Sequence, residues 1–325
     1  MQSGPTSFHT PVLLREVLQY LQPKPGDVFV DGTLGGAGHA AEFARAVAPN
    51  GTVVGIDLDP AAVQAAEQRI KAQNIKSNTI FIQGNYRDIG LILAARNITQ
   101  ANGILIDIGI SSYDLNASQR GFTFQKDEPL DMRFNPDEHP ENKRKQPLTA
   151  QFIINHYSEK ELKNIFDEYG EEKFSGRIAK AILAERQQKA INSTLELFQI
   201  IKKSLPAAIR FKAGDSARRI FQALRIEVNA ELDNLTAFLP EAFRLLVPQG
   251  RLAVISFHSL EDRIVKQYFA EMARGCICPP DFPKCVCGRN PLARIITKKP
   301  VTASPEEISE NPRSAPAKMR VIEKI

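Results

Sequence analysis

Short apolar runs alternate with segments of helical periodicity along the first hundred residues. We predict strands at the four apolar runs, residues 28–31, 52–57, 79–82 and 103–108. Apolar positions at helical spacing fill the other segments, and we predict helices over residues 11–21, 39–47, 60–73 and 89–96. Short buried strands that alternate with helices are typical of a parallel sheet covered on both faces. This part of the chain therefore predicts an α/β fold.

The alternation stops near residue 116. From there to residue 212 we find no buried strand, but a polar, proline-containing stretch and several helical patterns. Two of these patterns begin with capping boxes, Ser158 with Glu161 and Ser193 with Glu196. We therefore predict an inserted helical domain over residues 116–212.

The α/β pattern returns after the insertion. It predicts long helices within 217–246, a strand at 250–257, a helix at 260–272 and two short late strands at 294–297 and 319–323. We expect residues 1–115 and 213–325 to form one domain on both sides of the insertion.

Composition and charge narrow the class of protein. The chain has 325 residues, of which 43% are hydrophobic and 24% charged, as in ordinary globular proteins. No apolar run approaches the ~18 residues of a membrane span, and the N-terminal residues lack a leader pattern. We therefore expect a cytoplasmic protein without membrane contact.

The net charge of +5 is unevenly distributed. Residues 202–225 hold seven basic residues and one acid, which leaves the rest of the chain nearly neutral. A basic segment of this kind favours a polyanionic partner such as RNA, although a solvated helix face gives the same pattern.

A glycine-rich turn, DGTLGGAGH at 31–39, follows the first predicted strand and opens a helix. Such turns let a ligand approach backbone N–H groups at a helix N-terminus. With Asp31, Asp57 and Asp107 at strand ends, three carboxylates are expected at one edge of the sheet. A dinucleotide and S-adenosylmethionine both fit. The acid that ends the first strand favours S-adenosylmethionine, because its charge can balance the cationic methionine moiety.

Ten segments match the motifs of one known family, in order and across nearly the whole chain. They are HTPVLLREVL (9–18), DGTLGGAGH (31–39), GIDLDP (55–60), LIDIGISSYDL (105–115), RGFTF (120–124), PLDMRF (129–134), GEEKFSGRIAKAI (170–182), RRIFQALRIEVNAEL (218–232), QGRLAVISFHSLEDRIVK (249–266) and NPRSAPAKMRVIEK (311–324). By these segments the chain resembles the ribosomal RNA small subunit methyltransferase H family.

The resemblance implies a Rossmann-like class I methyltransferase whose parallel-dominated sheet is interrupted by a helical RNA-recognition domain. It implies transfer of a methyl group from S-adenosylmethionine to N4 of a cytidine in the decoding centre of 16S rRNA. The substrate would be that rRNA within the small ribosomal subunit. The oligomeric state is left open, with a homodimer as one alternative. Carried over by motif, the implied cofactor-binding residues are Ala37, Gly38, His39, Asp57, Tyr86, Asp107 and Asp114. Asp114 stands where the family usually has glutamine.

Methyl transfer to N4 needs acceptors for the amine protons, because the nitrogen lone pair is delocalised into the ring. We assign this role to Asp107, Ser111 and Ser112, with loop or capping roles as the alternative for the serines. The candidate stacking faces for a flipped base, each with a core role as its alternative, are Tyr113, Phe122 and Phe124.

Two further groups have two interpretations each. Ser259 with Asp262 either caps a helix, which we favour, or takes part in the chemistry, while His258 faces the crevice. Asp131 and Arg133 either close the site or form an ion pair.

All four cysteines lie in two Cys-x-Cys pairs, Cys276 with Cys278 and Cys285 with Cys287. A cytoplasmic location argues against a disulfide. A zinc site and free thiols on a loop are the alternatives, and we assign no metal ligand to the catalytic site.

Two other function classes compete with the methyltransferase. One is a non-catalytic ribosome-assembly or RNA-binding protein on the same fold, and the other is a nicotinamide-dependent oxidoreductase. Binding of S-adenosylmethionine is the first test between these classes, and binding of NAD without S-adenosylmethionine would favour the oxidoreductase.

Overall fold

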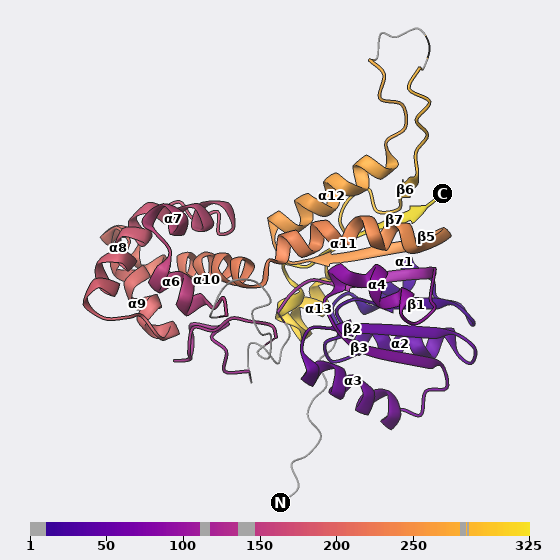
Figure 1. The fold of residues 1–325 in the computed structure, drawn as a ribbon, viewed down its shortest axis with the longest axis horizontal. Coiled ribbons are helices and arrows are strands. Elements are labelled where there is room, and N and C mark those ends of the chain that lie inside the picture. The colour runs from indigo at the N-terminus through magenta and orange to yellow at the C-terminus, as the bar shows by residue number, and fades with distance from the viewer. Residues whose placement is uncertain (1–10, 111–117, 136–146, 280–283, 285) are drawn as a thin grey trace, which may run out of the picture. The chain divides into compact units, whose positions relative to one another are not determined.

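The computed structural model describes residues 11–110, 118–135, 147–279, 284 and 286–325 (Figure 1). The chain forms two compact units. One comprises Met1–Gly109 and Leu232–Ile325, and the other is Ile110–Glu231. The second unit is therefore inserted into the first.

The first unit is built on a seven-stranded sheet of order β3-β2-β1-β4-β5-β7-β6. Its strands are β1 (Val28–Asp31), β2 (Thr52–Asp57), β3 (Asn78–Gln83), β4 (Ala101–Asp107), β5 (Leu246–Ser256), β6 (Ala293–Ile295) and β7 (Lys318–Lys324). Strands β1 to β5 pair in parallel, whereas β7 runs antiparallel to both of its neighbours, β5 and β6. All seven predicted strands are present, and the parallel-dominated α/β fold is confirmed.

Helices cover both faces of this sheet. Successive strand residues point to opposite sides, so buried apolar side chains lie on both faces and each face packs against helices. They are α1 (Leu14–Leu21), α2 (Gly38–Val47), α3 (Pro60–Ala72), α4 (Ile89–Ala94), α11 (Glu231–Leu245), α12 (Ser259–Ala273) and α13 (Pro305–Glu310). Buried Phe29 of β1 packs in the core beneath α1, α2 and α3. Its neighbour Val30 packs in the opposite core, with α4, α11 and α12. No helix of the described residues is both long and apolar enough to cross a membrane.

Helix α1 begins later than predicted. The structure starts it at Leu14, after Leu13 in a left-handed conformation (φ 53°). The reason is that the preceding backbone is bonded elsewhere: the Val12 carbonyl lies 2.9 Å from His39 Nε2, and the Leu13 N–H donates to Glu307 Oε1 at 2.8 Å.

The inserted unit has its own core. Its residues 118–135 form no helix, and its described residues from 150 onward are mostly helical. Its helices are α6 (Ala150–His156), α7 (Glu159–Glu168), α8 (Ser175–Gln188), α9 (Thr194–Ser204) and α10 (Ala213–Asn229), with a 3₁₀ turn at Ala207–Lys212. Both predicted capping boxes, at Ser158 and Ser193, are formed.

The inserted unit extends beyond the boundary expected from the sequence. We expected it to end at residue 212, whereas the structure continues it through α10 to Glu231. The physical reason is the apolar face of α10: Ile220, Phe221 and Leu224 are buried in the core that α7, α8 and α9 share. The helix ends at Ala230, which adopts a left-handed conformation (φ 49°).

Candidate active site

Three aspartates end three adjacent strands at one edge of the sheet. Asp57 ends β2, Asp31 ends β1 and Asp107 ends β4. Between β1 and β4 the chain order reverses, because the chain leaves β1 outward to β2 and β3 and returns on its other side. Open α/β sheets bind ligands at such a switch point, beyond the carboxyl ends of the strands. The structure thus brings the three predicted acids together.

Thr33 ties the two central strands together at this edge. Its N–H donates to Asp31 Oδ1 at 3.2 Å, and its Oγ1 accepts the Asp107 N–H at 2.6 Å. Sequence reasoning missed Thr33. Its place two residues after a strand-end aspartate is the signal of an Asx-type turn that could have indicated it.

The glycine-rich turn is fixed by Asp57. Gly35 has φ +46°, a conformation that favours glycine, and its N–H donates to Asp57 Oδ2 at 2.7 Å. The Arg69 guanidinium donates to the Gly36 carbonyl at 2.7 Å. The turn is therefore ordered before any ligand binds.

Burial strongly perturbs two of the three acids. Burial raises the pKa of Asp31 well above its usual value; the Thr33 N–H opposes this, and the charges of Asp107 and Asp57 add to it. Burial, with a smaller contribution from the charge of Glu261, raises the pKa of Asp107 to about 7. Among the described residues, Asp31 Oδ2 and Asp107 Oδ1 are shielded from solvent and have no hydrogen-bond partner. A cationic group with N–H donors would complement such a site.

Glu261 is a second residue that sequence reasoning missed. It is 1% exposed, and its Oε2 accepts the N–H groups of Phe257 (2.9 Å) and His258 (3.3 Å) at the start of α12. The predicted cap by Ser259 and Asp262 is wrong, because Asp262 instead accepts two bonds from Arg320 of β7, at 2.6 and 3.1 Å. His258 Nε2 lies 3.0 Å from Glu261 Oε1, without the angle of a hydrogen bond.

The other predicted cofactor residues surround the turn. Ala37 (φ 54°) is fully buried before α2, and a Cβ on Gly38 would lie 2.9 Å from Pro11. His39 Nε2 lies 2.9 Å from the Val12 carbonyl oxygen, so the buried ring packs against the segment before α1. Tyr86, in the 3₁₀ turn Tyr86–Asp88, packs edge-on against Phe238 with ring centroids 5.4 Å apart.

Four predicted site residues lie outside the described residues: Ser111, Ser112, Tyr113 and Asp114. Their roles in catalysis and cofactor binding stay predictions.

In the inserted unit, the two phenylalanines proposed as stacking faces belong to the core. Phe122 stacks on Phe134, and Phe124 stacks on Phe198, with ring centroids 5.5 and 5.3 Å apart. The structure therefore favours the core alternative for both.

Asp131 and Arg133 form an ion pair. Arg133 donates from Nε and Nη2 to the two carboxylate oxygens of Asp131, each at 2.8 Å. This two-bond geometry supports the second of the two interpretations.

Two arginines of the basic segment are held by buried acids. Arg219 bonds to Glu172, whose side chain is fully buried, at 2.7 Å, and Arg225 bonds twice to Glu231 at 2.7 and 2.8 Å. Lys202, Lys203 and Lys212 are exposed. Arg210 and Arg218 are exposed as well. The charge available to a polyanion is therefore smaller than the sequence indicates, and lies with the three lysines and these two arginines.

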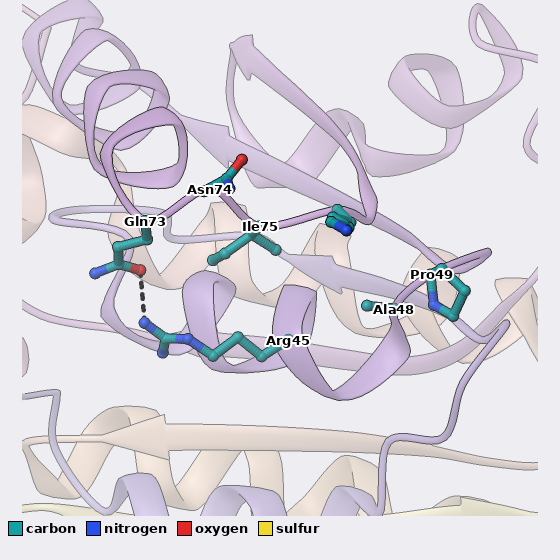
Figure 2. Close-up of a pocket in the computed structure, with 7 residues that line it drawn as sticks. Arg45, Ala48, Pro49, Gln73, Asn74 and Ile75 are labelled. Carbon is teal, nitrogen blue, oxygen red and sulfur yellow. Dashed lines mark hydrogen bonds between the residues drawn. The ribbon is translucent and has the colours of Figure 1, made fainter.

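A hollow of about 440 Å³ lies at the opposite edge of the sheet, where β2 and β3 begin (Figure 2). Arg45 and Gln73 bond across it at 2.8 Å, beside Pro49 and Asn74. Asp31, Asp57 and Asp107, which we call the acidic edge, lie at the other end of these strands. This hollow is therefore not the candidate site.

Comparison with known proteins agrees with the sequence motifs. The model of the MraW methylase family matches residues 6–325. The ribosomal RNA small subunit methyltransferase H of Heliobacterium modesticaldum is 48% identical over 318 residues, which are 98% of this chain and 98% of that protein. The protein of the same name from Halothermothrix orenii is 45% identical over 317 residues, again 98% of each chain.

Among solved structures, an rRNA methylase from Streptococcus thermophilus aligns with a TM-score of 0.40 and 10% identity, over 96% of this chain and 92% of that one. A likeness of this degree carries no weight beside the sequence relatives.

Proposed function

The chain belongs to the MraW methylase family, and we propose that it methylates N4 of a cytidine in the decoding centre of 16S rRNA. It is an S-adenosylmethionine-dependent methyltransferase, and the curated relatives carry the name of a small subunit rRNA methyltransferase. The observation that carries the proposal is the acidic edge, where Asp31, Asp57 and Asp107 end adjacent strands.

The acidic edge fits S-adenosylmethionine by charge. Buried Asp31 and Asp107 have solvent-shielded oxygens, while the cofactor carries a sulfonium and an ammonium group. Asp57, at the end of β2, is placed to accept hydrogen bonds from the two ribose hydroxyls. The glycine-rich turn offers backbone N–H groups at the N-terminus of α2.

In the proposed reaction the cofactor supplies a methyl group from its sulfonium: the N–CH₃ bond forms, the S–CH₃ bond breaks, and N4 loses one proton to the Asp107 carboxylate. Asp107 accepts a hydrogen bond from N4 and draws electron density toward the nitrogen, so that its lone pair can attack in line. Ser111 and Ser112 follow in sequence and are proposed as further acceptors. No nucleophilic cysteine is needed for an exocyclic amine.

Cofactor affinity should depend on pH. Because the pKa of Asp107 is about 7, the carboxyl group is largely protonated at pH 6, and a cationic ligand prefers the ionised form. We expect the affinity for S-adenosylmethionine to rise about tenfold from pH 6 to pH 8 and then level off. Isothermal titration calorimetry in buffers of different ionisation enthalpy checks this.

Two controls accompany that titration. S-adenosylhomocysteine lacks the sulfonium charge and should show a weaker pH dependence. The Asp107→Asn variant should bind with nearly constant affinity across the range. Equal pH dependence in the variant and the wild type would show that another group titrates.

RNA binding should depend on the exposed lysines of the inserted unit. Replacing Lys202, Lys203 and Lys212 with glutamine should weaken binding of small subunit rRNA and reduce the slope of log affinity against log salt by about one unit per lysine. Filter binding over a range of salt concentrations measures both quantities.

The matched control removes three exposed lysines from the other unit: Lys24, Lys71 and Lys76. It has the same change in net charge, and we expect the slope to stay near that of the wild type. If both triple variants lose the same slope, the effect comes from net charge and not from a defined RNA-binding surface.

The decisive test of function is chemical. Purified enzyme and S-adenosylmethionine are incubated with small subunits and, separately, with free rRNA from cells lacking this activity, and the nucleosides are identified by mass spectrometry. N4-methylcytidine at one site supports the proposal. Methylation at C5 or the ribose would reject the proposed chemistry, and cofactor binding without methylation would favour a non-catalytic assembly protein.

A further inference from the structure

Three cysteine thiols come together in the segment between α12 and β6. These cysteines are far in sequence from the aspartates of the acidic edge. Two chain segments leave α12 and β6 (Figure 1). Cys276 and Cys278 on the first lie close to Cys287 on the second. All three are reduced, and their sulfur atoms lie within 4.8 Å of one another.

The spacing of the sulfur atoms fits tetrahedral zinc. Cys276 Sγ and Cys287 Sγ are 3.7 Å apart. Two thiolates at the usual Zn–S distance of about 2.3 Å from a tetrahedral ion lie about 3.8 Å apart. The separation also exceeds the roughly 2.05 Å of a disulfide bond.

Backbone N–H groups already point at these sulfurs. Cys278 N–H donates to Cys276 Sγ at 3.4 Å, Val286 N–H donates to Cys278 Sγ at 3.4 Å, and Ile277 N–H donates to Cys287 Sγ at 3.5 Å. Each sulfur therefore accepts a hydrogen bond that would offset the negative charge of a metal-bound thiolate.

In the part of this segment that the structure describes, no buried apolar side chain explains why the thiols come together. The apolar side chains beside the cysteines, Ile277 and Val286, are 47% and 72% exposed. Contacts at the base explain only how the segment is anchored: Arg289 donates to Glu271 Oε1 at 2.6 Å, and Leu292 N–H donates to the Met272 carbonyl at 2.9 Å. A small element without a core commonly depends on a metal or a disulfide.

We propose that Cys276, Cys278 and Cys287 bind a structural zinc ion that fastens this segment. The sequence alone left zinc and free thiols as alternatives. The short distances between the sulfurs and the N–H groups that donate to them favour zinc. Soft thiolate ligands favour zinc over magnesium or calcium. On binding, each thiol releases its proton. Cys285 lies outside the described residues, and the proposal does not depend on it.

The test is metal analysis of the purified full-length protein, expressed with added zinc and handled without chelators. We expect about one zinc per chain, and cobalt substitution should give thiolate-to-metal charge-transfer absorption. We expect each of three single variants to lose at least about 90% of the zinc that the wild type keeps after the same dialysis: Cys276→Ser, Cys278→Ser and Cys287→Ser. Val286→Ser, which changes the same segment without removing a thiol, should keep it.

A second readout follows the segment itself. Trypsin should cut within residues 274–292 at least about tenfold faster after zinc is removed, while wild type and Val286→Ser stay protected with zinc bound. The proposal is overturned if the protein binds no zinc under these conditions, if iron is the metal found, or if zinc persists in the three serine variants.

Discussion

Asp107→Asn should lower the rate of methyl transfer by about 10²- to 10⁴-fold, the usual contribution of a positioned proton acceptor. The substitution keeps the shape of the side chain but puts an amide where the N4 amine needs an acceptor. Because the pKa of Asp107 is about 7 in the free protein, wild-type turnover should rise with pH along an acidic limb. That limb should lie at or below pH 7, since a bound cation lowers the pKa. The variant should lack it.

The measurement is single-turnover methylation of small subunits across pH 5.5–9, beside calorimetric binding of the cofactor. A catalytic role requires the rate to fall much further than the affinity. Asp27→Asn is the matched control, because Asp27 precedes β1 at the opposite end of the strands and its carboxylate accepts the local Lys24 N–H at 2.9 Å. If Asp107→Asn turns over at near the wild-type rate, Asp107 is not the proton acceptor.

Asp57→Ala should weaken cofactor binding about 100-fold. Two effects combine: the ribose hydroxyls lose a charged acceptor, worth about 1.5–3 kcal/mol per hydrogen bond, and the Gly35 N–H loses its partner at 2.7 Å. The turn would then be less well ordered before binding. Calorimetric titration with S-adenosylmethionine measures the change, and adenosine alone should show most of it, because the contact is to the ribose.

Asp59→Ala is the control for Asp57. Asp59 lies two residues further on and caps α3 by accepting the Ala61 N–H at 2.9 Å. Its loss should cost about 1 kcal/mol of stability with little change in cofactor affinity. Should the two variants lose affinity equally, the loss reflects disturbance of the loop and not a ribose contact.

The fold was predictable where local pattern and global packing agree. Strands β1 and β2 have the predicted bounds, because each is a short apolar run that ends in aspartate at a tight turn. The boundary of the insertion was not predictable, because α10 has the same helical pattern whichever core it packs in. Only the tertiary contacts of Ile220, Phe221 and Leu224 assign it to the inserted unit.

The sequence was enough to predict which acids lie at the strand ends of the site. It was not enough to predict the hydrogen bonds and charge interactions that connect them to other residues. The sequence places Asp31 and Asp107 at strand ends, yet the Thr33 bridge between them requires β1 and β4 to be neighbours. Glu261 is more than 150 residues from Asp107 in the chain, and it influences that carboxyl group only because β5 and α12 return to the same edge. The pairing of Arg219 with buried Glu172, 47 residues away in the chain, was hidden for the same reason.

The strand order has a consequence for how the chain acquires its activity during synthesis. Strand β4 pairs with β5 only after the entire inserted unit has been made, and β7, the last strand of the chain, fills the place between β5 and β6. The entropic cost of bringing β4 and β5 together grows only logarithmically with the number of residues between them. The pairing nevertheless cannot begin before the late strands emerge from the ribosome. A nascent or truncated chain without Lys318–Lys324 therefore leaves residues 251–256 of β5 unpaired on one side, where another strand could add and cause aggregation. The catalytic unit is a late product of translation, although its cofactor-binding turn is among the first parts made.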